Sequence, residues 1–247
     1  GEADPEMNSE LMDFDGRTAE AFIENTGQWD EDVLFHSVTD FGSISITEDG
    51  IVYNTISEKG GETGIDSVSL SFEGGTMERT SGMEKLDTTY NYFIGKDPAR
   101  WKTSVPSYQK VKVTDLWEGI DLEYYLNDEG LKYDLVLSPY SDVSDIHMDM
   151  EGVERIRVSP DTMIMDLDSG ISLNDGGLKA FHDDGSGEVV DVDFKPVSDN
   201  GYTFKVSGWD RSRPLRIDPI VYATFIGGMH SDSSTGMSVD DNGDFYL

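Results

Sequence analysis

No cysteine occurs among the 247 residues, and only 18 lysines and arginines stand against 50 aspartates and glutamates. The missing cysteines exclude disulfides, thiol chemistry and thiolate metal sites. The formal net charge of −32 argues against nucleic acid as a partner, because phosphates need cations opposite them. It also argues against docking on an anionic membrane surface. No apolar run approaches the roughly eighteen residues of a membrane-spanning helix, so we expect no transmembrane segment.

The composition is that of a globular protein and not of a disordered acidic tail. Hydrophobic residues make up 36% of the chain and aromatic residues 11%. The acids are dispersed through turns and polar strand faces, where their mutual repulsion opposes a compact fold and salt relieves it. Two interpretations stay open, namely adaptation to high ionic strength of the halophile type and simple solubility.

Apolar and polar residues alternate along most of the chain, as in "VLFHSV", "YQKVKV" and "LKYDLVL". This period of two places apolar side chains on one face of a sheet. Asp or Asn beside Gly in "TEDGI", "LNDEGL", "LNDGGL", "HDDGSG" and "SDNGY" predicts hairpin turns between the runs. The sequence therefore predicts an all-β fold of antiparallel, sandwich-like domains. One short helix is expected at 17–29, before Asn25-Thr26-Gly27 ends it.

The expected domain organisation has three parts. Residues 1–16 form a flexible acidic lead-in, and residues 17–219 form the all-β domain. Proline and small polar residues near 138–145 indicate a division of that domain into two units. A new pattern begins after Pro219, so residues 220–247 are expected to form a separate segment.

That last segment carries glycine, aspartate and tyrosine at positions that resemble the bacterial and archaeal β-propeller repeat known as SBBP. The matching residues are Tyr222, Thr224, Gly227, Gly228, Asp232, Gly236, Val239, Asp240, Gly243 and Tyr246. The region before it, with "FIENTGQWDEDVLFHS" and "YNYFIGKDPARWKTSVPSYQKVKVTDLWEGIDLEYY", resembles the all-β domain that commonly precedes such repeats.

The resemblance implies an extracellular or cell-surface protein of bacterial or archaeal type with many modules. It implies no catalytic residues. Because a single partial repeat cannot close a propeller, we expect the chain to be a fragment or its last strands to pack on the main domain or on another copy.

Aromatic residues and lysines gather between Arg100 and Pro139, and Trp101, Tyr108 and Trp117 are candidate binding residues. The structural interpretation is a packed β scaffold, and the binding interpretation is an aromatic groove that stacks on sugar rings. A protein–protein contact is the third. In the scaffold interpretation, cross-strand ion pairs join three lysines to three acids: Lys110, Lys112 and Lys132 to Asp121, Glu123 or Asp134.

Arg211, Arg213 and Arg216 are a second candidate set, close together in "WDRSRPLRIDP". They can clamp a carboxylate or sulfate ligand. Alternatively, they pair with nearby acids and fix the end of the domain.

Calcium is the one cofactor that we consider, because Asp240, Asn242 and Asp244 place oxygen atoms at the spacing of a calcium loop. A solvated hairpin tip is the alternative. The four histidines have no metal-site spacing, and no G-x-S-x-G motif occurs. We predict no catalytic residues.

These observations together predict a non-enzymatic, secreted or surface-displayed structural or adhesive module. Its expected partners are other surface proteins or copies of itself, joined through edge strands. A carbohydrate-binding module is the first alternative, with a glycan as its ligand. A glycoside hydrolase or another extracellular enzyme is the second.

Overall fold

The computed structural model describes residues 21–39, 42–59, 62–127, 130–160, 162–167 and 172–222, and the pairs 238–239 and 245–246. Most of these residues are in antiparallel strands, so the predicted all-β class is confirmed. Two 3-10 helices of three residues each are η1 (Pro98–Arg100) and η2 (Val143–Asp145). The strands are β1 (Phe22–Glu24), β2 (Val33–Thr39), β3 (Gly42–Thr47), β4 (Gly50–Lys59), β5 (Glu62–Phe72), β6 (Thr80–Tyr92), β7 (Lys102–Trp117), β8 (Ile120–Asn127), β9 (Gly130–Leu137), β10 (Met148–Glu151), β11 (Arg155–Ser159), β12 (Thr162–Asp166), β13 (Ser172–His182), β14 (Val189–Pro196), β15 (Gly201–Ser207), β16 (Leu215–Tyr222), β17 (Ser238–Val239) and β18 (Phe245–Tyr246).

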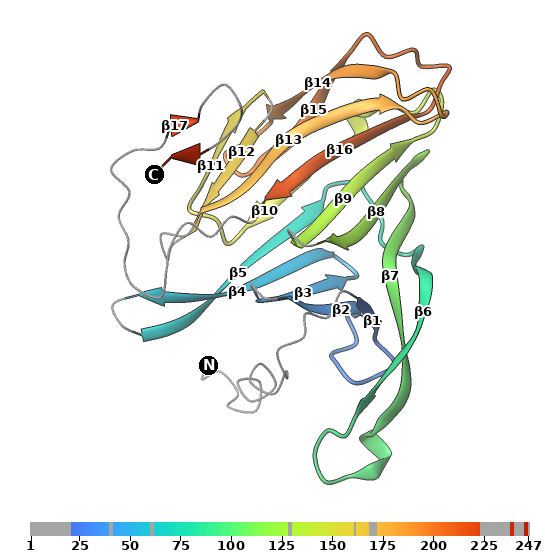
Figure 1. Ribbon diagram of the computed structural model, residues 1–247, viewed down its shortest axis with the longest axis vertical. Coiled ribbons are helices and arrows are strands. Elements are labelled where there is room, and N and C mark those ends of the chain that lie inside the picture. Colours follow the sequence, from blue (N-terminus) through green and yellow to red (C-terminus); the bar gives the residue numbers. More distant parts are fainter. Residues whose placement is uncertain are drawn as a thin grey trace.

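Sixteen strands pair in one sheet, and the order of pairing returns to its start (Figure 1). It runs β13–β14–β15–β10–β5–β4–β3–β2–β1–β7–β8–β9–β16, and β16 pairs again with β13. Strands β12 and β11 continue from β13, and β6 lies along β7. Within the described sheet, β6 and β11 each pair with one neighbour only. Closure thus protects most strand edges from pairing with other chains.

Strand β7 joins the two halves of the circuit. Tyr108 pairs with Phe22 of β1 and with Lys85 of β6. Further along, Lys110 pairs with β8 and again with β6. Because β6 follows one edge of β7, β1 and β8 lie one after the other on the opposite edge. The first residues of β7 extend beyond both of them, which leaves the β6–β7 hairpin projecting from the body.

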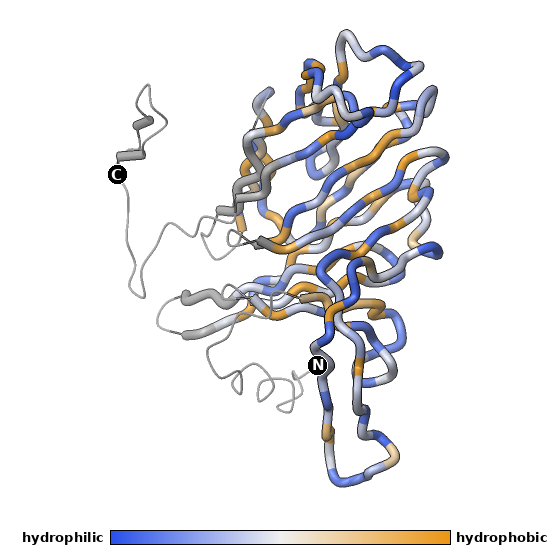
Figure 2. The backbone as a smooth tube through the Cα atoms, turned by 45° about the vertical axis from the view of Figure 1, so that its right-hand side comes forward, coloured by the Kyte–Doolittle hydropathy of each residue, from blue (hydrophilic) through white to orange (hydrophobic). Residues whose placement is uncertain are grey.

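The interior of the circuit is filled with apolar side chains. Ile46, Val113, Leu122 and Ile217 come from four different strands, and each has 0% of its surface exposed. Figure 2 shows the matching alternation of hydrophobic and hydrophilic residues along the strands. The alternation of the sequence therefore specifies an inner and an outer face, as predicted.

Two local predictions are wrong. The described part of the expected helix at 17–29 contains β1, because Phe22 and Ile23 are buried at 0% and 1% exposure between β2 and β7. Burial in the sheet outweighs a weak helical preference. The predicted turn in "LNDGGL" lies inside β13, where a register shift between Gly176 and Lys179 accommodates the glycines. It is a β-bulge and not a hairpin.

Residues 138–145 connect β9 to β10 through η2. Strands on the two sides of this connection pair with one another, β9 with β16 and β5 with β10. Both sides therefore belong to one sheet. The expected lead-in at 1–16 lies outside the described residues, as does most of 220–247. No helix in the described ranges is long and apolar enough to cross a bilayer.

Candidate functional site

The hairpin of β6 and β7 projects from the body (Figure 1). We call residues 80–113 the arm, and residues 93–102, which lead from β6 into β7, its tip. Register shifts interrupt the β6–β7 pairing between Lys85 and Thr89 and between Tyr90 and Tyr92. Such bulges bend a hairpin and break up its hydrogen-bonding edge. The free edge of β6 is therefore a poor template for another strand, so a contact made by the arm would depend on its side chains.

The base of the arm is anchored by Tyr108. Its hydroxyl donates a hydrogen bond to Glu24 Oε2 (2.9 Å), and its ring lies edge-on to Phe35, with centroids 5.8 Å apart. The ring also covers Gly82, where an added Cβ would lie 2.4 Å from Tyr108 Cγ. This predicted binding residue is therefore engaged in holding the arm against β1 and β2.

The tip holds two large aromatic rings in the open. Phe93 is 62% exposed and Trp101 is 40% exposed. Their ring centroids are 5.3 Å apart, with the planes at 89°. The Trp101 indole donates to the Gly95 carbonyl (3.4 Å), and Asp97 Oδ1 accepts from the Ala99 amide (3.0 Å) at the start of η1. Exposed aromatic residues on an ordered turn are typical of binding surfaces.

The arm also differs from the rest of the chain in charge. Residues 80–113 contain six bases and three acids, a net charge of +3, so the other 213 residues carry −35. At the tip, Lys96 and Arg100 are exposed, and neither makes an ion pair with any described residue. The carboxylate of Asp97 caps η1. The tip therefore presents cations and aromatic rings together.

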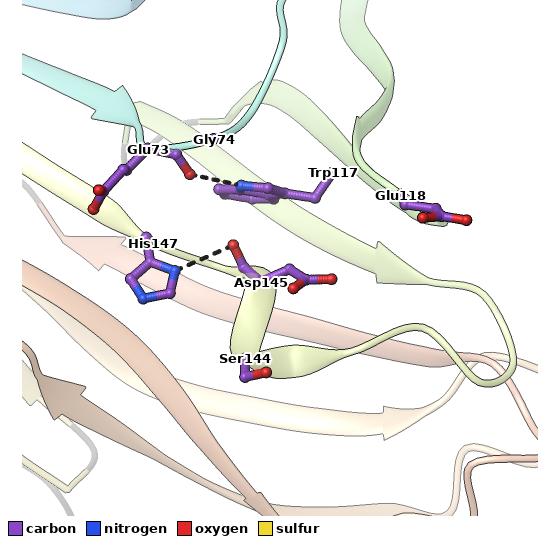
Figure 3. A pocket seen from close by; sticks show the side chains of 7 residues that line it. All are labelled: Glu73, Gly74, Trp117, Glu118, Ser144, Asp145 and His147. Carbon is purple, nitrogen blue, oxygen red and sulfur yellow. Dashed lines mark hydrogen bonds between the residues drawn. The ribbon is translucent and has the colours of Figure 1, made fainter.

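An open cleft lies at the other end of β7 (Figure 3). Its volume is about 410 Å³. The indole of Trp117 is 5% exposed, donates to the Glu73 carbonyl oxygen (3.0 Å) and packs edge-on against Phe72. Trp117 thus contributes to the wall of the cleft but has little surface free for stacking. The lining residues are Glu73, Gly74, Trp117, Glu118, Ser144, Asp145 and His147.

The cleft is acidic. Glu73, Glu118 and Asp145 are exposed, and their carboxylates make no ion pair within the described ranges. His147 Nδ1 lies 3.3 Å from the Asp145 carbonyl oxygen. The cleft therefore combines three uncompensated carboxylates with an aromatic wall, the chemical complement of the tip.

A half-buried ionic network crosses β7, β8, β9 and β16. Lys112 Nζ lies 2.9 Å from Asp121 and 3.3 Å from Glu123, which are cross-strand pairs that the scaffold interpretation predicts. Arg216 contacts Glu123 (3.0 Å), Asp134 (2.6 Å) and Asp183 (3.1 Å). Burial raises the pKa of Asp134, and Arg216 opposes that rise.

The other two candidate arginines are also engaged. Arg213 contacts Asp184 and Glu188, both at 2.7 Å, and its hydrogen bond holds the pKa of Asp184 well below the usual range. Arg211 donates instead to the carbonyl oxygens of Tyr140 and Ser141, both at 2.9 Å. Arg213 and Arg216 therefore pair with nearby acids, whereas Arg211 binds backbone carbonyl oxygens.

The predicted site residues do not form one groove. Trp101 lies at the tip, Tyr108 at the base of the arm and Trp117 in the cleft. Sequence reasoning missed Phe93, Lys96 and Arg100, although "FIGKDPARWK" places bases between two aromatic residues in a connecting loop. The missed carboxylates of the cleft come from three separate connections, and no local pattern could have joined them.

No group of three or more histidine, aspartate or glutamate side chains suited to a metal ion is found in the described part of the chain. The calcium candidates Asp240, Asn242 and Asp244 lie outside that part.

Comparison with known proteins gives one result. The family model for a domain of unknown function, DUF7948, matches residues 22–220. The chain belongs to this family. The matched range begins at β1 and ends within β16, so the DUF7948 domain includes the circuit, the arm and the cleft. No curated protein and no solved structure matches the chain.

Proposed function

We propose that this DUF7948 chain is a non-enzymatic module of an extracellular or cell-surface protein, with a structural or adhesive role. Its contact surface is the tip of the arm, and its partner is an acidic protein surface. The observation that carries the proposal is the exposed Phe93–Trp101 pair beside the cations of Lys96 and Arg100, which make no ion pair with any residue that the structure describes.

Three physical arguments support the tip as the contact surface. Tryptophan and arginine are over-represented among residues that dominate binding energy. The tip is ordered by its own hydrogen bonds, so little conformational entropy is lost when it binds. Its positive charge on a strongly acidic chain directs it towards carboxylates and away from cationic surfaces.

The location outside the cell rests on the resemblance of residues 20–247 to SBBP-containing proteins. Edge-strand pairing is the other expected route to assembly. In the described sheet, β11 and β6 each have a free edge, but the bulges of β6 disfavour pairing there. Light-scattering masses of the chain with and without residues 221–247 test whether the last segment contributes to assembly. Equal monomeric masses would contradict such a contribution.

The proposal is tested with beads that carry the chain and a surface coated with poly-glutamate, a plain carboxylate probe. We expect wild-type beads to adhere at about 0.15 M salt, where the Debye length is about 8 Å. Beads with Phe93→Ser and Trp101→Ser should detach. Equal adhesion of both would contradict the role of the tip, and robust turnover of any substrate by the purified chain would contradict a non-enzymatic role.

Carbohydrate binding is a second candidate, and the 40% exposure of Trp101 favours it. Aromatic rings stack on sugar rings as well as on protein side chains. A glycan array distinguishes a carbohydrate ligand from an acidic protein partner. Binding that Trp101→Ala abolishes would favour the carbohydrate, and an array without signal would favour the acidic protein surface.

A further inference from the structure

We infer that the tip of one copy docks in the acidic cleft of a second copy, so that copies join head to tail. The inference rests on the proposed function, because it identifies the acidic partner as the chain itself. The contact pairs the cations of Lys96 and Arg100 with the carboxylates of Glu73, Glu118 and Asp145.

Charge complementarity is the first argument. Several bases outside the tip have acidic partners: Lys112, Arg213 and Arg216 each contact two or more carboxylates. Lys96 and Arg100 at the tip have no acidic partner in the described part of this acid-rich chain. The cleft carboxylates have no cation among the described residues either. Two unpaired surfaces of opposite charge, each with an aromatic ring, therefore lie on the same molecule.

Geometry excludes the same contact within one chain. Lys102 of the tip and Trp117 of the cleft are the first and last residues of β7. At about 3.3 Å per residue, a strand of this length separates its ends by up to about 50 Å. The strand is held by pairing with β6, β1 and β8. The tip can therefore reach a cleft only on another copy.

A contact between two different surfaces of the same protein does not close on itself. Each copy that docks its tip still offers a free cleft, so assembly continues into an open chain. The net charge of −32 opposes the approach of copies at low salt, and screening reduces this repulsion over distances beyond the Debye length. The short-range aromatic contact remains when salt is added.

The test uses two charge-reversed chains and sedimentation velocity over a concentration series at about 0.15 M salt. One has a reversed tip, Lys96→Glu with Arg100→Glu. The other has a reversed cleft, Glu73→Lys with Glu118→Lys. The wild-type chain should form species larger than dimers, and each variant alone should associate at least about tenfold more weakly. An equimolar mixture of the two should again form species larger than dimers, because the intact tip fits the intact cleft and the acidic reversed tip fits the basic reversed cleft.

Lys195→Glu with Lys205→Glu is the matched control, because it makes the same charge change on β14 and β15 and should assemble as the wild type does. Circular dichroism checks that every variant folds. If the reversed tip does not fold, the milder pair Lys96→Gln with Arg100→Gln replaces it, and this variant should also associate more weakly than the wild type. A monomeric wild-type chain at all concentrations, or a mixture that stays monomeric, would overturn the inference. If wild-type beads still adhere to poly-glutamate in that case, only the choice of partner fails and the proposed function stands.

Discussion

The hydroxyl groups of Tyr133 and Tyr202 lie 3.1 Å apart in the interior, where they join β9 to β15. These strands are not neighbours in the sheet, so the hydrogen bond crosses the inside of the circuit. A third tyrosine differs from them. The Tyr124 hydroxyl is buried and has no hydrogen-bond partner among the described residues.

Removing one hydroxyl should therefore have opposite effects at two sites. Tyr133→Phe loses a buried hydrogen bond and should lower the free energy of unfolding by about 1 kcal/mol. Tyr124→Phe removes a buried polar group without a partner and should raise it by about 1 kcal/mol. Urea denaturation of the two variants measures both changes, and a loss of the same size at both sites would show that the hydroxyls are equivalent.

Arg216→Met should destabilise the fold by about 2 kcal/mol, because it leaves Glu123 and the more buried Asp134 without their shared cation. Chemical denaturation measures the loss. Asp134→Asn in the same chain should recover part of it, since a neutral amide needs no counter-charge. Arg213→Met is the comparison, because the acids near Arg213 are more exposed, and its loss should be smaller. Equal losses would contradict a special role for the half-buried network.

His36 should make the fold sensitive to mild acid. Burial lowers its pKa from 6.5 to about 4, so the native ring stays neutral while the unfolded chain takes up a proton as pH falls through 6.5. The His36 contribution is therefore present above pH 6.5 and is lost between pH 6.5 and about 4, by on the order of 3 kcal/mol.

The difference in unfolding free energy between wild type and His36→Gln isolates this effect. Protonation of surface carboxylates changes repulsion equally in both chains and cancels from the difference. We expect the wild type to lose stability relative to His36→Gln as pH falls from 7 to 4. A difference that is constant over this range would contradict the burial of a neutral ring.

Salt should stabilise the folded chain, because 50 acids against 18 bases leave an excess of negative charges that repel one another in a compact shape. Between about 0.01 M and 1 M salt the Debye length falls from about 30 Å to about 3 Å. The urea midpoint should rise as salt is added. A flat or falling midpoint would show that repulsion among the acids does not lower the free energy of unfolding.

Much of the fold could be predicted from local patterns. Alternation in "YQKVKV" and the Asp-Gly pair in "TEDGI" correspond to β7 and to the β3–β4 hairpin, whose register includes Thr47 opposite Gly50. The asparagine and glycine of "SDNGY" lie at the turn into β15. These elements depend on neighbours in sequence, so a local reading is sufficient.

Closure and the contact surfaces could not be predicted in this way. The pairing of β13 with β16 and the crossing of β7 between β1 and β8 depend on residues far apart in the chain. The short strand at Phe22 is specified by the strands on both sides and not by its own sequence. The cleft likewise forms only where the ends of β5, β7 and η2 meet.

The most direct measurement of the central claim is covalent footprinting of aromatic side chains in the assembled or bead-bound chain. Phe93 and Trp101 at the tip should lose reactivity on contact. Tyr140, which is 71% exposed and lies outside the arm, is the internal control for contact with poly-glutamate and should keep its reactivity there. Protection of Tyr140 with an unchanged tip would contradict the account, because the chain would then make its contacts through another surface.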